Sequence, residues 1–181
     1  MVVDEIAAAR EARSQGRVKH RPVKFNLIDK IEHLSADRLV GVKYVSLAEE
    51  YLADHFPTFP VLPGVMMLEA ITQACGWLLH QKRDFACSMA VLKEARNVRY
   101  GNFVAPGNFL RVEIELTKES ENGGVFKATG TVGDAQALSA RVEIAYFNLA
   151  DKQPELADID RRLKEHNRNR WALLKQGSVS I

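Results

Sequence analysis

Apolar and polar residues alternate along the second half of the chain, as they do in half-exposed antiparallel strands. Residues 110–117 and 138–147 both follow this pattern. The tripeptide NGG at 122–124 is typical of a hairpin turn and predicts a partner strand over 125–132. An earlier segment, 38–45 (RLVGVKYV), also has the composition of a strand. The pattern therefore predicts antiparallel strands, most of them consecutive in the chain.

A different pattern fills residues 64–80, where apolar residues occupy nearly every face of a predicted helix. Pro63 suits the start of a helix, because its fixed φ and missing N–H are tolerated in the first turn. A helix that is apolar almost all round is normally buried on several sides. The order of strand, helix and strands predicts an α+β fold, in which one sheet wraps around one central helix. Residues 4–16 and 151–176 are predicted as further helices outside the core.

The composition excludes several classes of protein. The chain has 181 residues, 46% of them hydrophobic and 27% charged, with a formal net charge of +2. These values fit one globular domain and do not suggest a nucleic-acid-binding protein. Two cysteines are too few for a disulfide framework, which favours a reducing compartment. No secretory signal is evident, and prolines and Glu69 interrupt the most apolar window, 56–79, so we expect a cytoplasmic protein without a membrane span.

Residues 55–69 bring together three groups suited to acid–base chemistry. Glu69 is the only carboxylate in residues 56–79, and apolar surroundings favour the protonated form that a general acid needs. His55 precedes three closely spaced prolines, and a positioned imidazole is the usual general base near neutral pH. Gly64 begins the helix, whose first-turn N–H groups lack intrahelical acceptors. They could stabilise a carbonyl oxygen that gains negative charge.

Each of these features also has a simpler explanation. A histidine beside a proline-rich turn is most often an ordinary loop residue, and a lone glutamate on an apolar helix can face solvent or an interface. Proline followed by glycine is common before helices. Their conjunction within fifteen residues favours a functional site.

The spacing of these residues predicts how the site is shared between chains. Five residues separate Gly64 from Glu69, about 500° of helical rotation, so the two point about 140° apart. Glu69 is therefore not expected to serve the donor site at the start of its own helix. A symmetric dimer, in which Glu69 reaches His55 of the other chain, is the simplest solution. Gln73 lies one turn beyond Glu69 on the same face and is expected to orient it.

The same residues resemble a known family. The segment HFPTFPVLPGVMMLEAITQACG at 55–76 is similar to the 3-hydroxyacyl-acyl-carrier-protein dehydratases of the FabZ type. That family's pattern is HFP, two residues, PV, one residue, PG, and then a helix bearing LEA or IEA and a glutamine. FNLIDKI at 25–31 and EARNVRYGNFVAPGN at 94–108 resemble the family more loosely, and the resemblance covers about residues 22–147.

The resemblance implies a hot-dog fold and an activity. The implied reaction is dehydration of a (3R)-3-hydroxyacyl thioester on acyl carrier protein to the trans-2-enoyl thioester, in fatty acid or related acyl-chain synthesis. His55 would remove the α-proton, and Glu69 of the partner chain would expel the hydroxyl as water. The Gly64 N–H would hold the thioester carbonyl, and the Val61 carbonyl would orient His55. The implied assembly is a homodimer, often a trimer of dimers, and neither a cofactor nor a metal is implied.

The remaining predicted substrate-binding residues are Val65, Gln73, Phe56 and Phe59. Thr58 and Phe59 replace the Gly-Arg usual in the family, which is expected to narrow the pocket or change carrier docking. The basic segments at 10–24 and 161–175 would attract an acidic carrier protein. We expect an N-terminal helical appendage at 1–21, a hot-dog domain at 22–148 and a charged helical appendage at 149–181.

Two other functions remain open at this stage. A hot-dog acyl thioesterase also places a carboxylate on the central helix, and a non-catalytic acyl-carrier-binding protein would use the same fold. Among the other residues, Cys75 is interpreted as a buried packing residue, and Trp77 and Trp171 likewise. The histidines outside the motif share no metal-ligand spacing and are interpreted as surface or structural residues; they are His20, His33, His80 and His166.

Overall fold

The computed structural model describes residues 25–176 and 179–180, except residues 55 and 57. Within this part of the chain one sheet holds strands in the order β3-β6-β5-β4-β2-β1-β7. Neighbouring strands pair antiparallel, apart from β7, which pairs parallel with β1. The strands are β1 (Lys30–Leu34), β2 (Arg38–Tyr44), β3 (Met89–Tyr100), β4 (Phe109–Ser120), β5 (Gly123–Val132), β6 (Ala135–Phe147) and β7 (Val179–Ser180). The strands expected from alternation are thus confirmed as β2, β4, β5 and β6.

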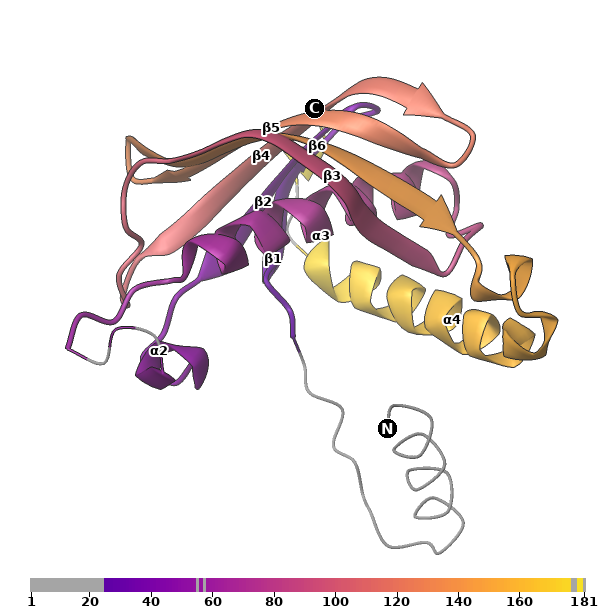
Figure 1. Cartoon of the computed structure of the whole chain (residues 1–181), viewed down its shortest axis with the longest axis horizontal. Coiled ribbons are helices and arrows are strands. Elements are labelled where there is room, and N and C mark those ends of the chain that lie inside the picture. Colours follow the sequence, from indigo (N-terminus) through magenta and orange to yellow (C-terminus); the bar gives the residue numbers. More distant parts are fainter. Residues whose placement is uncertain (1–24, 55, 57, 177–178, 181) are drawn as a thin grey trace, which may run out of the picture.

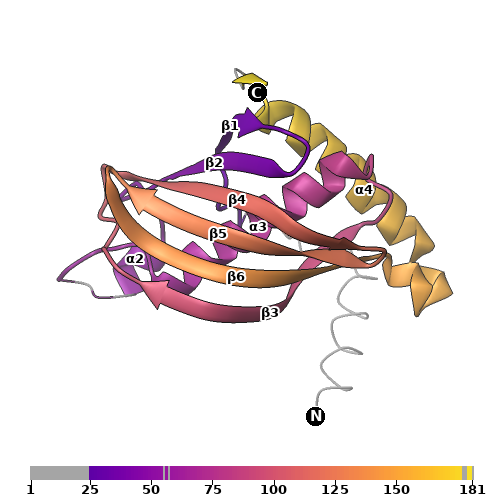
Figure 2. The same ribbon diagram turned by 90° about the horizontal axis from the view of Figure 1, so that it is seen from above.

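Helix α3 (Gly64–Lys82) lies under the arched sheet (Figure 1), crossing several of its strands (Figure 2). Its apolar side chains form the centre of the hydrophobic core, as the pattern at 64–80 predicts. The fully buried ones include Ala70, Ile71, Ala74, Cys75 and Leu79. An antiparallel sheet wrapped around one long helix is the hot-dog fold, so the expected fold class is confirmed.

The turn between β4 and β5 forms where the NGG tripeptide predicts it. Ser120 pairs with Gly123 at the end of the hairpin. Gly123 has a φ of 147°, and a Cβ there would lie 1.9 Å from the Ile144 carbonyl oxygen of the adjacent strand. Only glycine avoids this contact, which explains the residue type at the turn.

Strand β3 has no clear alternation and is not predicted from the sequence. It forms one edge of the sheet and pairs only with β6 in the described part of the chain. Its register shifts between Leu92 and Glu94 and again between Arg96 and Arg99, and Asn97 adopts a φ of 52°. Such irregularities move side chains from one face to the other, so the period-two pattern is lost.

The C-terminal helix is part of the core, contrary to expectation. After short 3₁₀ turns η1 (Leu149–Asp151) and η2 (Pro154–Leu156), helix α4 (Ala157–Leu174) lies below the C-terminal part of α3 (Figure 1) and crosses its direction (Figure 2). Trp171 and Leu174 are buried in the main core, and the ring of Trp171 stacks on that of Trp77 at 6.0 Å between centroids. The prediction that this segment lies outside the core is therefore wrong. Most of its residues are charged or polar, so the few apolar residues that face the core do not form a recognisable pattern in the sequence.

Two further expectations concern other parts of the chain. The helix expected over 4–16 lies outside the described residues, and the domain boundaries at 21/22 and 148/149 stay predictions.

The short helix α2 (Tyr51–Asp54) precedes the HFP segment. Within the described ranges, no helix is long and apolar enough to cross a membrane.

Candidate active site

The start of helix α3 opens onto a cavity of about 340 Å³. The cavity is bordered on one side by residues 61–64 and on the other by residues 100–103, with Phe56 at its edge. Intrahelical bonding begins when the Met66 and Met67 amides donate to the Pro63 carbonyl, at 2.9 and 3.1 Å. The amides before them belong to the first turn, where the helix dipole adds partial positive charge. This end of α3 is therefore suited to bind an oxygen that carries negative charge.

Gly64 also has a steric reason to be glycine. A Cβ at this position would lie 2.9 Å from Cε1 of the Tyr100 ring, closer than van der Waals contact allows. Tyr100 comes from the end of β3, thirty-six residues away in the sequence. The ring therefore covers the first turn of α3 only because no side chain stands between them.

The other predicted residues of this region differ in their positions. Val61 is 1% exposed and borders the cavity, whereas Val65 is 71% exposed and does not border it. Phe56 borders the cavity and has a φ of 53°. The Phe59 ring packs edge-on against Phe103 at 5.5 Å between centroids, and Phe103 borders the cavity. Phe59 thus contributes to this region through a second aromatic side chain that sequence reasoning missed.

His55 lies outside the described residues, so its predicted role as the base stays a prediction. Its neighbours are described on both sides: α2 ends at Asp54, and the Phe59 amide donates to the Phe56 carbonyl at 2.8 Å. Of these neighbours, Phe56 borders the cavity at Gly64.

Glu69 is half-buried on α3 and is held by Gln73, as the spacing of four residues predicts. Nε2 of Gln73 donates to Oε1 of Glu69 at 3.0 Å. The same Nε2 lies 3.3 Å from the Phe25 carbonyl, and Oε1 of Gln73 accepts from the Leu27 amide at 2.8 Å. Gln73 therefore ties the carboxyl group to the backbone that leads into β1, which fixes the amide's orientation.

Gly64 and Glu69 occupy different surroundings within one chain. Among the described residues that line the cavity at Gly64, Glu69 does not occur. Glu69 instead contacts Gln73, which in turn contacts the Phe25 carbonyl. This agrees with the rotation of about 140° between the two positions on one helix. Within one chain, the two groups therefore do not line one common pocket among the described residues.

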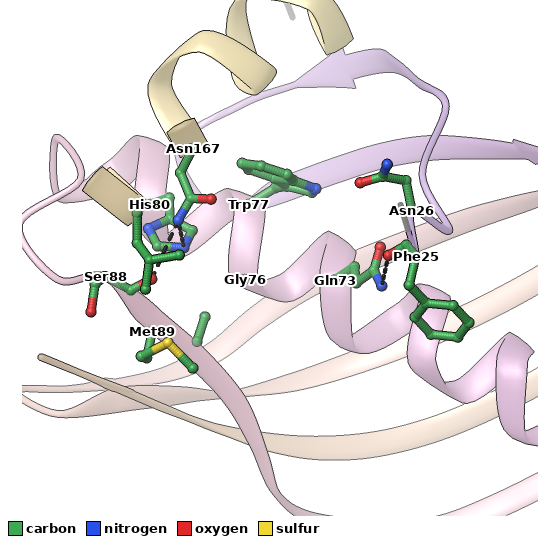
Figure 3. A pocket seen from close by; sticks show the side chains of 11 residues that line it. Phe25, Asn26, Gln73, Gly76, Trp77, His80, Ser88, Met89 and Asn167 are labelled. Carbon is green, nitrogen blue, oxygen red and sulfur yellow. Dashed lines mark hydrogen bonds between the residues drawn. The ribbon is translucent and has the colours of Figure 1, made fainter. Parts of the chain in front are cut away.

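A second pocket, of about 250 Å³, begins at Gln73 and extends between α3, the start of β3 and α4 (Figure 3). Phe25 and Gln73 lie at one end, Trp77 between, and His80 and Asn167 at the other. Sequence reasoning missed this pocket, because its far wall comes from α4 and no local pattern indicates where that helix packs.

His80 is buried, which excludes the surface alternative considered for it. Burial lowers the pKa of His80 to about 4, so its imidazole is neutral at physiological pH. Its Nδ1 lies 3.1 Å from the Tyr146 hydroxyl, and its ring stacks on Phe85 at 5.5 Å between centroids. These contacts make His80 a structural residue with both ring nitrogens in polar contact, the second with Asn167 at 3.4 Å.

Cys75 is fully buried on α3, as expected, and burial raises the pKa of its thiol. A thiol held in its neutral form is a poor nucleophile. In the part of the chain that the structure describes, no group of three or more His, Cys, Asp or Glu side chains is arranged to hold a metal ion.

Comparison with known structures defines the class of fold. The dehydratase heterocomplex ApeI:P from Xenorhabdus doucetiae has a chain with a TM-score of 0.63 at 18% identity, covering 76% of this chain and 93% of that one. An uncharacterized protein of Pyrococcus horikoshii has a TM-score of 0.53 at 13% identity, covering 70% and 88%. At these identities the likeness concerns the fold alone.

Sequence comparison identifies the family. Residues 19–141 match the model of the FabA-like domain. The 3-hydroxyacyl-acyl-carrier-protein dehydratase FabZ of Solibacter usitatus is 35% identical over 136 residues, which cover 75% of this chain and 84% of the relative. The FabZ of Clostridium perfringens strain SM101 is 36% identical over 121 residues, covering 67% and 87%. The chain belongs to the FabA-like family, among relatives of the FabZ type, and helix α4 lies beyond the matched domain.

Proposed function

We propose that this protein dehydrates (3R)-3-hydroxyacyl thioesters on acyl carrier protein to trans-2-enoyl thioesters. The observation that carries the proposal is the fixed carboxyl of Glu69, held by Gln73 on the helix whose first turn opens onto a cavity. Membership of the FabA-like family and relatives named FabZ support the same reaction.

The proposed mechanism assigns one step to each group. His55 accepts the α-proton, and the electrons of the broken C–H bond form the double bond between the α- and β-carbons. Protonated Glu69 gives its proton to the β-hydroxyl, which leaves as water when the C–O bond breaks. The Gly64 N–H donates to the thioester oxygen, which gains negative charge as the α-proton leaves. Val61 orients His55 through its carbonyl, and Gln73 keeps the Glu69 carboxyl directed towards the β-oxygen.

The proposal requires a homodimer in which Glu69 of one chain serves the site of the other. Strand β3 supports this arrangement, because it is a twelve-residue edge strand of the sheet in the described part of the chain. An edge of this length is available to pair with the same strand of a second copy. Further assembly into a trimer of dimers and a cytoplasmic location stay predictions.

Hydration of an enoyl thioester tests the reaction directly. The wild type is expected to hydrate crotonyl thioesters of acyl carrier protein, and His55→Ala and Glu69→Gln to lose about 100-fold or more in kcat. Glu165→Gln, a matched change at an exposed position of α4, should leave kcat unchanged. Undiminished activity in either site variant would contradict the assigned roles. Release of free thiol without hydration would show a thioesterase instead, and acyl-carrier binding without turnover a binding protein.

Mixing two inactive subunits tests the shared site. A dimer of one His55→Ala chain and one Glu69→Gln chain contains one site with both native groups and one with neither. Statistical subunit exchange should therefore restore about a quarter of the wild-type activity. If exchange is confirmed by mass and no activity returns, the site lies within one chain.

A further inference from the structure

The second pocket runs along the same face of α3 that carries the catalytic carboxyl. Glu69, Gln73, Trp77 and His80 follow one another at helical spacing, and Gln73 both binds Glu69 and lines the pocket. Eleven residues separate Glu69 from His80, about 16 Å along the helix. Figure 3 shows Gln73 at the near end of the pocket and His80 at the far end. The pocket therefore begins one turn beyond the proposed proton donor and leads away from it.

The proposed reaction places the two parts of the substrate on opposite sides of Glu69. The thioester carbonyl lies at the Gly64 amide of one chain, and the β-hydroxyl lies at Glu69 of the other. The acyl carbons beyond the β-carbon must therefore continue past Glu69, and Gln73, which lines the pocket, lies one helical turn beyond it. Phe25, Trp77, Met89 and Leu163 supply apolar surface there, as an alkyl chain requires.

The far end of the pocket is lined by α4. Nδ2 of Asn167 donates to the Ser88 carbonyl at 3.3 Å and lies 3.4 Å from Nε2 of His80. An alkyl chain that advanced further would have to displace Asn167 and leave these buried polar groups without partners, which is costly. At about 250 Å³, the pocket is also smaller than the usual range of about 300–1,000 Å³ for small-molecule sites.

We infer that α4, through Asn167 and Leu163, forms the end wall of an acyl-chain pocket and restricts the enzyme to short acyl chains. This inference rests on the proposed function for the direction of the substrate. It assigns a specificity role to a helix that lies outside the matched family domain, which ends at residue 141.

The test compares a series of acyl chain lengths with variants of the wall. Hydration of butenoyl, hexenoyl, octenoyl and decenoyl thioesters of acyl carrier protein is measured for the wild type, Asn167→Ala and Leu163→Ala. Asn169→Ala, the same change at an exposed position of the same helix, serves as the matched control. Because each methylene that becomes buried adds about fourfold, room for two methylenes should raise the octenoyl-to-butenoyl ratio of kcat/KM by about 15-fold. The wild type and Asn169→Ala should have the same octenoyl-to-butenoyl ratio of kcat/KM, lower than that of the two wall variants.

A binding measurement separates this inference from the proposed reaction. Saturated acyl-pantetheine thioesters of the same lengths are titrated calorimetrically into each variant, and thermal unfolding confirms that each is folded. A shift towards longer chains in either wall variant supports the end wall, even if the wild type turns over no substrate and the proposed reaction fails. If the folded wall variants keep the wild-type dependence on chain length in binding and turnover, the inference is wrong.

Discussion

Replacing Asp160 with alanine tests how α4 is attached to the rest of the fold. Asp160 is 4% exposed, although it lies on a helix most of whose other charged residues are exposed. Its carboxylate accepts hydrogen bonds from Ser88 Oγ, from the Leu149 amide at 3.0 Å and from the Ala150 amide at 2.8 Å. The side chain thus joins the start of α4 to the residue before β3 and to the 3₁₀ turn after β6.

The expected loss follows from the number and kind of these contacts. A hydrogen bond to a charged group contributes about 1.5–3 kcal/mol. Water can replace part of each bond, because Asp160 borders a surface pocket with Asn148 and Ala150. We therefore expect Asp160→Ala to lower the free energy of unfolding by about 3 kcal/mol and the melting temperature by about 6–12 °C. Asp160→Asn, which keeps an acceptor oxygen without the charge, should lose less.

The stabilisation that the Asp160 carboxylate contributes depends on pH. Burial acts to raise the pKa of Asp160, but the hydrogen bonds from Ser88 and the two amides, with the charge of Lys164, outweigh it and hold the pKa below its ordinary value. The unfolded chain therefore binds the proton more readily than the folded one. The stabilisation is fully present above the unfolded pKa of about 3.9 and is lost as the pH falls through the folded value. The difference between wild type and Asp160→Ala should be constant from pH 7 to about 5 and then shrink.

Urea unfolding monitored by tryptophan fluorescence measures these differences, since Trp171 lies on α4 and stacks on Trp77 of α3. Asp158→Ala is the matched control, because Asp158 occupies the same helix but binds only exposed arginines. It should leave the midpoint nearly unchanged. An Asp160→Ala variant as stable as this control would show that the buried hydrogen bonds do not hold α4 in place.

Three further predictions concern the site and the core. Gln73→Ala should lower kcat about 10- to 100-fold with a smaller change in KM, because it frees the carboxyl of Glu69; an unchanged kcat would exclude the positioning role. Gly64→Ala should lower kcat/KM because the added Cβ would contact the Tyr100 ring. Adding Tyr100→Ala in the same chain should restore part of the lost kcat/KM. If the effects of the two substitutions simply add in this double-mutant cycle, the steric explanation is wrong. The free energy of unfolding of the wild type should fall as the pH drops from about 6.5 towards 4, because His80 takes up its proton at a higher pH in the unfolded chain than in the folded one. His80→Phe should make that decline shallower. An equally steep decline in the variant would show that other groups cause it.

The sequence alone determines the elements that depend on neighbouring residues. Residues 64–80 form a helix because apolar side chains occupy nearly every face and Pro63 precedes them, and that helix ends within two residues of the expected position. The β4–β5 hairpin follows from glycine at 123, the one residue type that fits its φ. The contact between Glu69 and Gln73 is equally local, since residues four apart in a helix share a face.

Only the tertiary structure decides which distant segments meet. Asn167 and His80 are eighty-seven positions apart, and the charged composition of α4 hides the few residues that pack against α3. The Tyr100 ring reaches Gly64 because bulges along β3 change which face its side chains point to, and such bulges leave no periodic signal. The proposed acid–base residues thus follow from local spacing, whereas the walls of both pockets depend on packing between elements. That packing is set by shape and burial over the whole fold, which no single segment encodes.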